Sequence, residues 1–134
     1  MRKIEFLYIC KNFQTMYDFI QSYCLSKKAA EEDYQSEWDA IRYMVCGKMF
    51  AVIHNDREGV SVISVKNIPE HGIALREKYC EIIPGYHFNK THWSSVYLNG
   101  NLPETVLKQM LDESYELVFN KLPMKIKNEI LKND

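Results

Sequence analysis

The chain of 134 residues lacks a long apolar run and a strong net charge of either sign. No apolar run approaches the roughly 20 residues that a membrane-spanning helix needs, so the sequence excludes a spanning segment. Its formal net charge is −1, so the chain as a whole lacks the positive charge typical of a strong nucleic-acid binder. Any binding of nucleic acid must therefore come from a local basic patch.

Closely spaced cysteines are also missing. The four cysteines lie far apart, at Cys10, Cys24, Cys46 and Cys80. Without a Cys-x-x-Cys pair or a recognisable secretory leader, this spacing favours free thiols in a reducing, cytoplasmic compartment. Internal repeats, linkers and low-complexity tracts are absent too, and 46% of the residues are hydrophobic and 26% charged. The chain is therefore expected to form one globular domain.

Sequence motifs for catalysis and metal binding are absent. No serine or cysteine stands in a nucleophile-elbow sequence, and nothing else in the sequence supports a couple between Cys80 and His87. The four histidines are scattered, at His54, His71, His87 and His92. Because zinc sites take closely spaced pairs of ligands, we expect no metal, no cofactor and no enzymatic activity. His54 is expected to be hydrogen bonded within a strand, and His71 to lie on a helix surface.

Hydrophobic periodicity predicts three helices. Thr15 starts a sequence that resembles a capping box, and apolar residues at helical spacing follow it to about Ser26. Pro69 opens a second, less regular helix. The third helix begins at Pro103, a residue type that suits a first helical position, and its apolar face is the clearest in the chain. The polar residues 27–37 are expected to form a loop.

Runs of β-branched and apolar residues predict five strands. They span residues 41–46, 49–54, 60–65, 82–83 and 94–98. Short turn sequences separate the first three, which indicates an antiparallel meander. We therefore predict a two-layer α+β fold in the order helix, three strands, helix, two strands, helix, with an antiparallel sheet and the helices packed on one face. The acidic run Glu31-Glu32-Asp33 is expected to be solvated surface.

The segment from Gly85 to Trp93 carries more rings and polar groups than a routine connection needs. Tyr86 and Trp93 are expected to anchor it in the core as a supporting aromatic scaffold. Its candidate contact residues are His87, Asn89, Lys90 and His92. In a structural interpretation these polar groups bond the neighbouring backbone; in a functional one, Lys90 attracts phosphate and Asn89 bonds a phosphate or an adenine edge. Both interpretations hold together if the aromatic residues form a stiff platform.

Short motifs along nearly the whole chain resemble the pattern of one known family. They are Tyr23-Cys24-Leu25, Ala30-Glu31-Glu32-Asp33-Tyr34, Gly47-Lys48-Met49-Phe50-Ala51, Ile82-Ile83-Pro84-Gly85-Tyr86-His87, Asn89-Lys90, His92-Trp93, Leu102-Pro103, Ser114-Tyr115-Glu116-Leu117-Val118 and Leu122-Pro123. Their combination is similar to the signature of the MmcQ/YjbR family. The pattern has no counterpart for the N-terminus, so we expect residues 1–15 to be an extension and residues 16–134 to be a single family-like domain. Thr91 and Met124 stand where the family commonly has basic residues.

The resemblance implies an α+β fold and a function. Members of the family are described as DNA-binding proteins and likened to a double-wing motif, a CyaY-like fold or type III secretion chaperones. It therefore implies a small cytoplasmic DNA-binding protein with a regulatory role and no membrane partner, with His87, Asn89, Lys90 and His92 as the DNA contacts. The alternative is a protein-interaction or chaperone-like module that binds no nucleic acid. DNA sequence preference and oligomeric state stay open.

Surface charge distinguishes the two functions. A nucleic-acid binder is expected to gather Lys90, Lys121, Lys125 and Lys127 on one face, whereas an interaction module is expected to expose an apolar patch.

Overall fold

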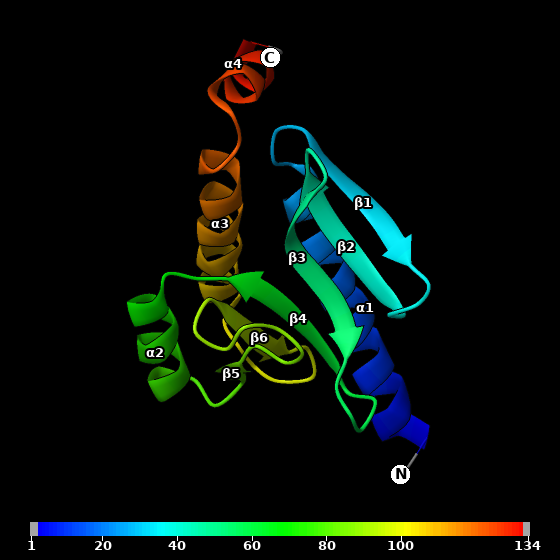
Figure 1. The fold of residues 1–134 in the computed structure, drawn as a ribbon. Helices are drawn as coiled ribbons and strands as arrows, with labels where there is room; N and C mark the ends of the chain where they lie inside the picture. Colours follow the sequence, from blue (N-terminus) through cyan, green and yellow to red (C-terminus); the bar gives the residue numbers. More distant parts are fainter. Residues whose placement is uncertain (1–2, 133–134) are drawn as a thin grey trace.

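The computed structural model describes the backbone of residues 3–132 and the side chains from Gln14 onward. The elements follow in the order α1 (Lys3–Leu25), β1 (Ala30–Gln35), β2 (Ala40–Val45), β3 (Lys48–Asn55), β4 (Ser61–Lys66), α2 (Pro69–Lys78), β5 (Ile82–Pro84), β6 (Trp93–Tyr97), α3 (Glu104–Asn120) and α4 (Met124–Lys132). Figure 1 shows α1 and α3 behind the sheet and the connection between β5 and β6 in front of it.

The strands form one antiparallel sheet with the order β1-β2-β3-β4-β6-β5. The first four strands are a meander, because each pairs with the next along the chain. The chain then passes through α2 and adds β5 at the far edge, and β6 returns between β5 and β4. The predicted α+β class with an antiparallel sheet is confirmed.

The helix-covered face of the sheet holds the main hydrophobic core. Ile20 and Cys24 of α1 and Leu107 and Leu111 of α3 are fully or almost fully buried against Tyr43 and its neighbours in the strands. This core includes Ile63, Val65 and Val96, which alternate with residues of the opposite face. Burial of these apolar side chains is the main force that fixes α1 and α3 on the sheet.

A serine of α3 forms hydrogen bonds with the backbone where the strand register shifts. The register between β2 and β3 shifts at Tyr43 and Met44, so the ladder is interrupted there. The hydroxyl of Ser114 donates to the carbonyl of Phe50 and accepts the backbone N–H of Lys66 at 2.9 Å. The buried hydroxyl of Ser114 therefore provides a hydrogen-bond partner for one backbone group of β3 and one of β4.

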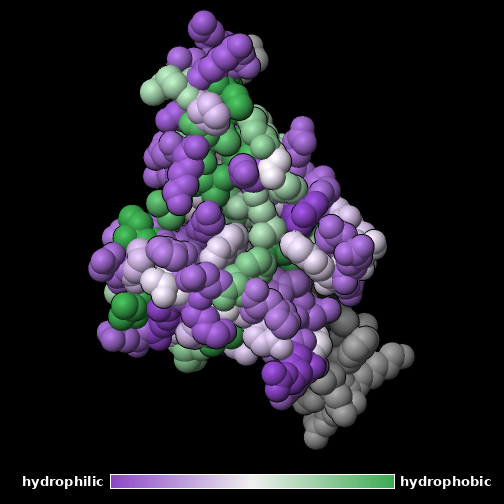
Figure 2. Space-filling view, in the orientation of Figure 1, coloured by the Kyte–Doolittle hydropathy of each residue, from purple (hydrophilic) through white to green (hydrophobic). Residues whose placement is uncertain are grey.

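The opposite, loop-covered face is also buried, although none of the helices within residues 3–132 packs on it. Val52, Val62, Ser64 and Ser95 lie on this face by strand alternation and are almost inaccessible to solvent. The connection between β5 and β6, residues 85–92, crosses this face in front of the sheet (Figure 1). In the space-filling view of the same side, hydrophobic colours form a strip over the middle of the face with hydrophilic colours around it (Figure 2).

Two predictions about the N-terminal part of the fold are wrong. The first helix begins at Lys3 and not at Thr15, which lies inside α1; the amide of Gln14 donates to the carboxylate of Asp18 at 2.9 Å across this point, a pair that helical spacing brings together. The expected loop over residues 27–37 contains β1. This edge strand is exposed over most of its length and therefore lacks apolar alternation.

Side-chain contacts hold β1 on the sheet. The guanidinium of Arg42 donates to both carboxylate oxygens of Asp33, at 2.8 and 2.6 Å, and the hydroxyl of Tyr43 donates to Glu32 at 2.8 Å. Burial and the bond to Glu32 raise the pKa of Tyr43. Glu31, Glu32 and Asp33 are exposed, as predicted.

The remaining elements agree with the expected order, and one more helix follows them. The predicted strands over residues 41–46, 49–54, 60–65, 82–83 and 94–98 are confirmed, as are the helix opening at Pro69 and the long helix after Pro103. After Leu122 the chain forms α4, whose Ile126 and Ile130 pack against the main core. No helix within residues 3–132 has the length and apolar character needed to cross a bilayer.

Candidate functional site

The β5–β6 connection is held by its own backbone. The N–H of Gly85 donates to the carbonyl of Trp93 at 2.9 Å, and the N–H of Trp93 donates to the carbonyl of Asn89 at the same distance. A Cβ at position 85 would lie 2.7 Å from the Cβ of Trp93, so only glycine allows this approach. His87 has a φ of 66°, a left-handed conformation that non-glycine residues seldom adopt.

The aromatic residues of this connection anchor it to the sheet. Trp93 is only 8% exposed, and Tyr86 is partly buried, so the burial predicted for both rings is confirmed. The ring of Phe88 stacks on Trp93 with a centroid separation of 4.6 Å. The backbone N–H of Tyr86 donates to the hydroxyl of Ser95 at 2.9 Å. These contacts give the loop a rigid base.

Two of the predicted contact residues have bonds within the loop. The side-chain oxygen of Asn89 accepts the backbone N–H groups of Thr91 and His92, at 2.9 and 3.1 Å. The ammonium of Lys90 donates to the carbonyl of Gly85 at 3.1 Å. Both side chains are nevertheless exposed. Their local bonds match the structural interpretation and leave their outer atoms accessible.

The four predicted contact residues divide between two hollows. His87 lines the first, which we call the aromatic hollow; its lining is Glu37, Trp38, Ala40, Val52, His54, Asn55, His87 and Phe88. Asn89 and His92 line the second, which we call the lysine groove; its lining is Lys66, Asn67, Ile68, Pro69, Asn89, His92, Trp93, Leu117 and Lys121. Their volumes are about 520 and 460 Å³. Lys90 lines neither.

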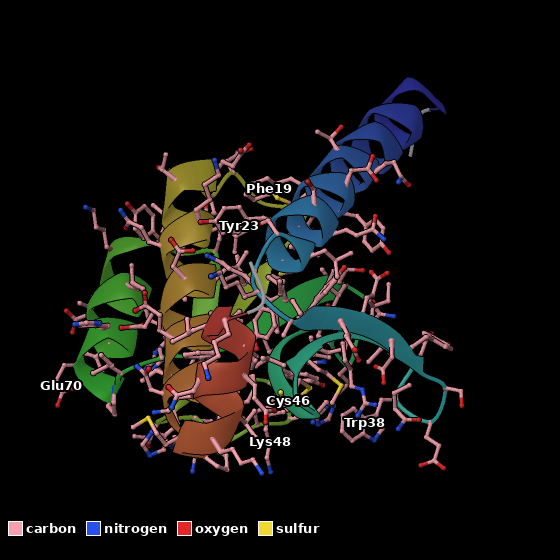
Figure 3. All side chains as sticks on the ribbon, turned by 90° about the horizontal axis from the view of Figure 1, so that it is seen from above. Phe19, Tyr23, Trp38, Cys46, Lys48 and Glu70 are labelled. Carbon is pink, nitrogen blue, oxygen red and sulfur yellow. The ribbon has the colours of Figure 1, made fainter. Side chains whose placement is uncertain are left out.

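The lysine groove concentrates positive charge. Burial and the neighbouring charges of Lys121 and Lys48 lower the pKa of Lys66. Among residues 14–132, no carboxylate lies within ion-pairing distance of these three lysines. Lys48 is the first residue of β3 and lies outside the lining of the groove (Figure 3). The groove is therefore an unneutralised cationic site whose charges repel one another.

The wall of the groove is fixed by Asn67. Its backbone N–H donates to the carbonyl of His92 at 2.9 Å, and its side-chain amide donates to the carbonyl of Thr91 at 3.2 Å. The hydroxyl of Ser94 donates to the side-chain oxygen of Asn67 at 2.6 Å. Asn67 therefore ties the end of β4 to the β5–β6 connection, and this tie holds Lys66 and His92 close together.

Of the four lysines expected to gather in a nucleic-acid binder, Lys121 lines the groove. Lys127 donates to the carbonyl of Asn120, the residue before Lys121, at 3.2 Å. Lys125 is exposed on the first turn of α4. The sequence analysis missed Lys48 and Lys66, because single lysines at strand ends carry no motif.

In the aromatic hollow, His54 is a buried polar residue. It is 7% exposed, and its Nε2 lies 2.7 Å from the hydroxyl of Ser64, so the prediction of a hydrogen-bonded strand histidine is confirmed. Burial, with a smaller contribution from nearby His87, lowers the pKa of His54 to about 4. The imidazole is therefore neutral near pH 7. The exposed ring of Trp38 was also missed by the sequence analysis, although a tryptophan within a polar turn is a usable signal.

Polar clusters on the helices have structural roles. Tyr23 and Lys27 both contact the carboxylate of Asp112 and so join α1 to α3; Figure 3 shows Phe19 and Tyr23 on the side of α1 that faces α3. The bond to Asp112 raises the pKa of Tyr23. His71 pairs with Glu113 on the surface of α2, where a surface histidine was predicted.

Thiols and metal ligands form no cluster in the described part of the chain. Cys24, Cys46 and Cys80 are free thiols. No group of three or more His, Cys, Asp or Glu side chains within that part could hold a metal ion.

Comparison with known proteins places the chain among several relatives. The YjbR family model matches residues 25–117. The uncharacterised protein YjbR of Escherichia coli K12 is 36% identical over 101 residues, which are 75% of this chain and 85% of that protein. The uncharacterised protein YyaQ of Bacillus subtilis is 33% identical over 58 residues, 43% of this chain and 48% of that protein.

Solved structures share the fold. The crystal structure of a Deinococcus radiodurans protein with a DUF419 domain has a TM-score of 0.75 and 30% identity, covering 85% of this chain and 86% of that one. A crystal structure from Pseudomonas syringae has a TM-score of 0.63 and 25% identity over 87% of this chain and 98% of that one. The matches in sequence and fold agree with the motifs around the β5–β6 connection, and the chain belongs to the YjbR family.

Proposed function

We propose that the protein binds DNA and that the lysine groove is the phosphate-binding part of its surface. The observation that carries the proposal is that Lys66 and Lys121 line one groove, with the charge of Lys48 also acting on Lys66. None of the three lysines has a carboxylate partner among residues 14–132. Their repulsion costs free energy in the free protein. A bound phosphate offsets that repulsion and raises the pKa of Lys66.

Neutral groups around the lysines support this proposal. His92 and Asn89 line the same groove, and both side chains are exposed. A histidine ring donates a hydrogen bond to phosphate, and the side-chain NH₂ of Asn89 stays available because the bonds within the loop use its oxygen. The near-neutral net charge of the chain makes nonspecific binding weak. Contacts of the groove lysines with phosphate make the binding sensitive to salt.

The distribution of exposed apolar residues favours DNA binding over a protein-interaction module. Leu25, Tyr34, Trp38, Ile68, Ile73, Met124 and Leu131 are the exposed large hydrophobic residues of the described chain. They are spread over α1, the β1–β2 hairpin, the start and middle of α2, and α4. An interaction module is expected to gather such residues into one patch.

The experiment is a salt titration of DNA affinity, measured by fluorescence anisotropy with a short labelled duplex. Affinity should fall as salt rises, and Lys66→Ala and Lys121→Ala should each lower the slope of log K against log salt by about one. Lys108→Ala is the matched control. Lys108 lies on α3 about 20 Å from Lys121 along the helix axis, so its removal should leave the slope unchanged.

Two outcomes would contradict DNA binding. They are the absence of binding to any duplex at low salt, and an affinity that does not depend on salt. Either result would leave the protein-interaction module as the better account.

A further inference from the structure

The aromatic hollow has the size and composition of a small-molecule site and is separate from the lysine groove. It lies between the β1–β2 turn, which supplies Trp38, and the β5–β6 connection, which supplies His87 and Phe88. Val52 lies at its base on β3. A volume of about 520 Å³ is within the range of ligand pockets.

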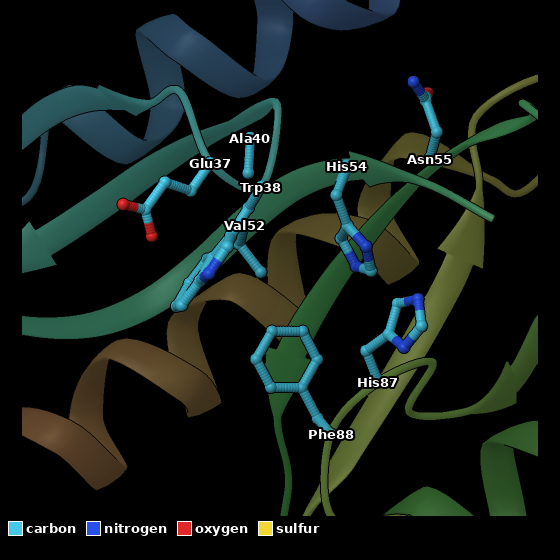
Figure 4. A pocket seen from close by; sticks show the side chains of 8 residues that line it. All are labelled: Glu37, Trp38, Ala40, Val52, His54, Asn55, His87 and Phe88. Carbon is cyan, nitrogen blue, oxygen red and sulfur yellow. The ribbon is translucent and has the colours of Figure 1, made fainter.

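Phe88 forms one wall of the hollow and is held in place by its neighbours, whereas the other wall is the exposed ring of Trp38. Phe88 is held by its stack on Trp93 and meets His54 edge to face at a centroid distance of 5.6 Å. Trp38 is 52% exposed, and the guanidinium of Arg42 lies 5.6 Å from its ring centroid. Figure 4 shows these two rings and the rings of His54 and His87 around one space.

The hydrogen-bond chain through Ser95 and Ser64 favours one tautomer of His54. A backbone N–H can only donate, so the hydroxyl of Ser95 accepts from Tyr86. The other hydrogen-bond partner of Ser95 is the hydroxyl of Ser64, 2.6 Å away. Donation from Ser95 to Ser64 is the arrangement that leaves the hydroxyl proton of neither serine without an acceptor. Ser64 in turn donates to Nε2 of His54. Nε2 is thus an acceptor, and the neutral ring carries its proton on Nδ1.

The Nδ1–H group of His54 is an unused donor at the hollow. It has no hydrogen-bond partner among residues 14–132. No inaccessible side-chain nitrogen or oxygen in that range lacks a partner, so Nδ1 reaches open space, and His54 lines the hollow. Glu37 and Asn55 turn their polar ends away from this space, whereas His87 faces it (Figure 4). The hollow therefore offers aromatic surface and a fixed donor.

We propose that the aromatic hollow binds a planar heteroaromatic ring that contacts Trp38 and Phe88 and accepts a hydrogen bond from Nδ1–H of His54. The aromatic walls provide dispersion and burial for a flat ring. The single buried donor selects rings with an acceptor at the edge, because a ring without one leaves Nδ1–H unpaired. Nucleobases have this chemistry, either as a free nucleoside or as an unstacked base of a single strand.

The test uses two probes of similar size, observed by ¹H–¹⁵N NMR of the intact chain. Quinoline accepts a hydrogen bond at its ring nitrogen, whereas indole only donates one. Quinoline should bind about tenfold more tightly and shift the signals of Trp38, His54 and Phe88. Trp38→Ala should weaken quinoline binding several-fold. Ile73→Ala is the matched control, because Ile73 is also 52% exposed but does not line the hollow, and it should have no effect.

Two further measurements check the donor and the source of the ring. Long-range ¹H–¹⁵N spectra should show the proton of His54 on Nδ1, and Ser64→Ala should reduce the preference for quinoline over indole. Adenosine and a single-stranded adenine oligonucleotide separate the two sources: equal binding per ring indicates a free small molecule, and tighter binding of the strand indicates an unstacked base. Equal affinity for quinoline and indole, a proton on Nε2, or no shifts at the hollow would overturn the proposal.

Discussion

The two faces of the sheet are buried in different ways. On the helix-covered face, apolar side chains of α1 and α3 fill the core, and the hydroxyl of Ser114 bonds to two strands. On the loop-covered face, eight residues of irregular chain cover the buried Ser64 and Ser95, and the aromatic hollow lies beside them. The lysine groove lies at the edge of this face, where Leu117 and Lys121 at the end of α3 also line it. The loop, held by its own backbone bonds, therefore leaves polar groups and space accessible. The comparison assigns stability to one face and binding to the other.

The largest expected effect tests whether the loop-covered face also contributes to stability. Trp93→Ala should lower the free energy of unfolding by about 3–5 kcal/mol, because a buried ring and the stack with Phe88 are lost. Leu111→Ala, on the helix-covered face, should lower the free energy of unfolding by a similar amount, about 2–5 kcal/mol. Urea unfolding of both variants measures this. An unchanged midpoint for Trp93→Ala would show that the loop contributes nothing to the fold.

Protonation of His54, which lies on the loop-covered face, should destabilise the fold. The folded pKa of about 4 is below the ordinary value of 6.5, so between these values the unfolded chain binds more protons than the folded one. The contribution of neutral His54 to the free energy of unfolding is fully present above pH 6.5 and is lost as the pH falls toward about 4. The loss amounts to about 3 kcal/mol.

The control for this pH dependence is His54→Gln. Unfolding midpoints of the wild type and this variant, compared from pH 7 to pH 4, isolate the histidine from the carboxylates. Parallel curves over that range would contradict a buried, neutral His54.

Two serines provide a matched comparison of the faces. Ser95→Ala leaves the backbone N–H of Tyr86 without its partner, and Ser114→Ala does the same to the N–H of Lys66. Each change should lower the free energy of unfolding by about 1–3 kcal/mol. Only Ser95→Ala should also speed amide hydrogen exchange in residues 85–92. Equal exchange in that segment for the two variants would argue against a loop held by Ser95.

Removal of residues 1–15 tests whether the helix-covered face needs the first half of α1 to fold. The buried residues Ile20 and Cys24 of α1 follow this segment, so a chain starting at Met16 should keep one cooperative unfolding transition. Circular dichroism during thermal unfolding measures this. A broad, non-cooperative transition would mean that the first half of α1 belongs to the folding unit.

The smallest expected effect concerns Lys90. Lys90→Ala should change stability by no more than about 0.5 kcal/mol, because the side chain is exposed and its bond to Gly85 is on the surface. If the protein binds DNA, the same change should weaken binding to all sequences alike. Asn89→Ala should change sequence preference only if Asn89 reaches a base edge. A large loss of stability in Lys90→Ala would assign the lysine a structural role.

Sequence patterns predicted most of the fold, because the buried strands and α3 carry clear apolar periodicity. β1 escaped prediction, since an edge strand exposed over most of its length has no alternation. The start of α1 was placed too late, because Thr15 followed by Asp18 also occurs inside helices, where Asp18 pairs with Gln14. Pairing with β2 decided the first case, and in the second the same residue types occur both at helix starts and inside helices.

The candidate site was harder to predict than the fold. The sequence identified Gly85–Trp93 as the unusual segment, but the left-handed turn at His87 sends that side chain to one hollow while Asn89 and His92 line the other. The remaining members come from distant elements: Trp38 from the β1–β2 turn and Lys66 from the end of β4. Only the folded sheet brings these residues together.

The most direct test of this account is a ¹H–¹⁵N NMR titration of the intact chain with a short DNA duplex at low salt. The account predicts that shifts gather at Lys66, Lys121 and His92, and that added salt reverses them. Residues of the helix-covered face, such as Leu107 and Leu111, should not shift. The absence of salt-sensitive shifts in the lysine groove, or shifts gathered on α1 and the first half of α3, would contradict it.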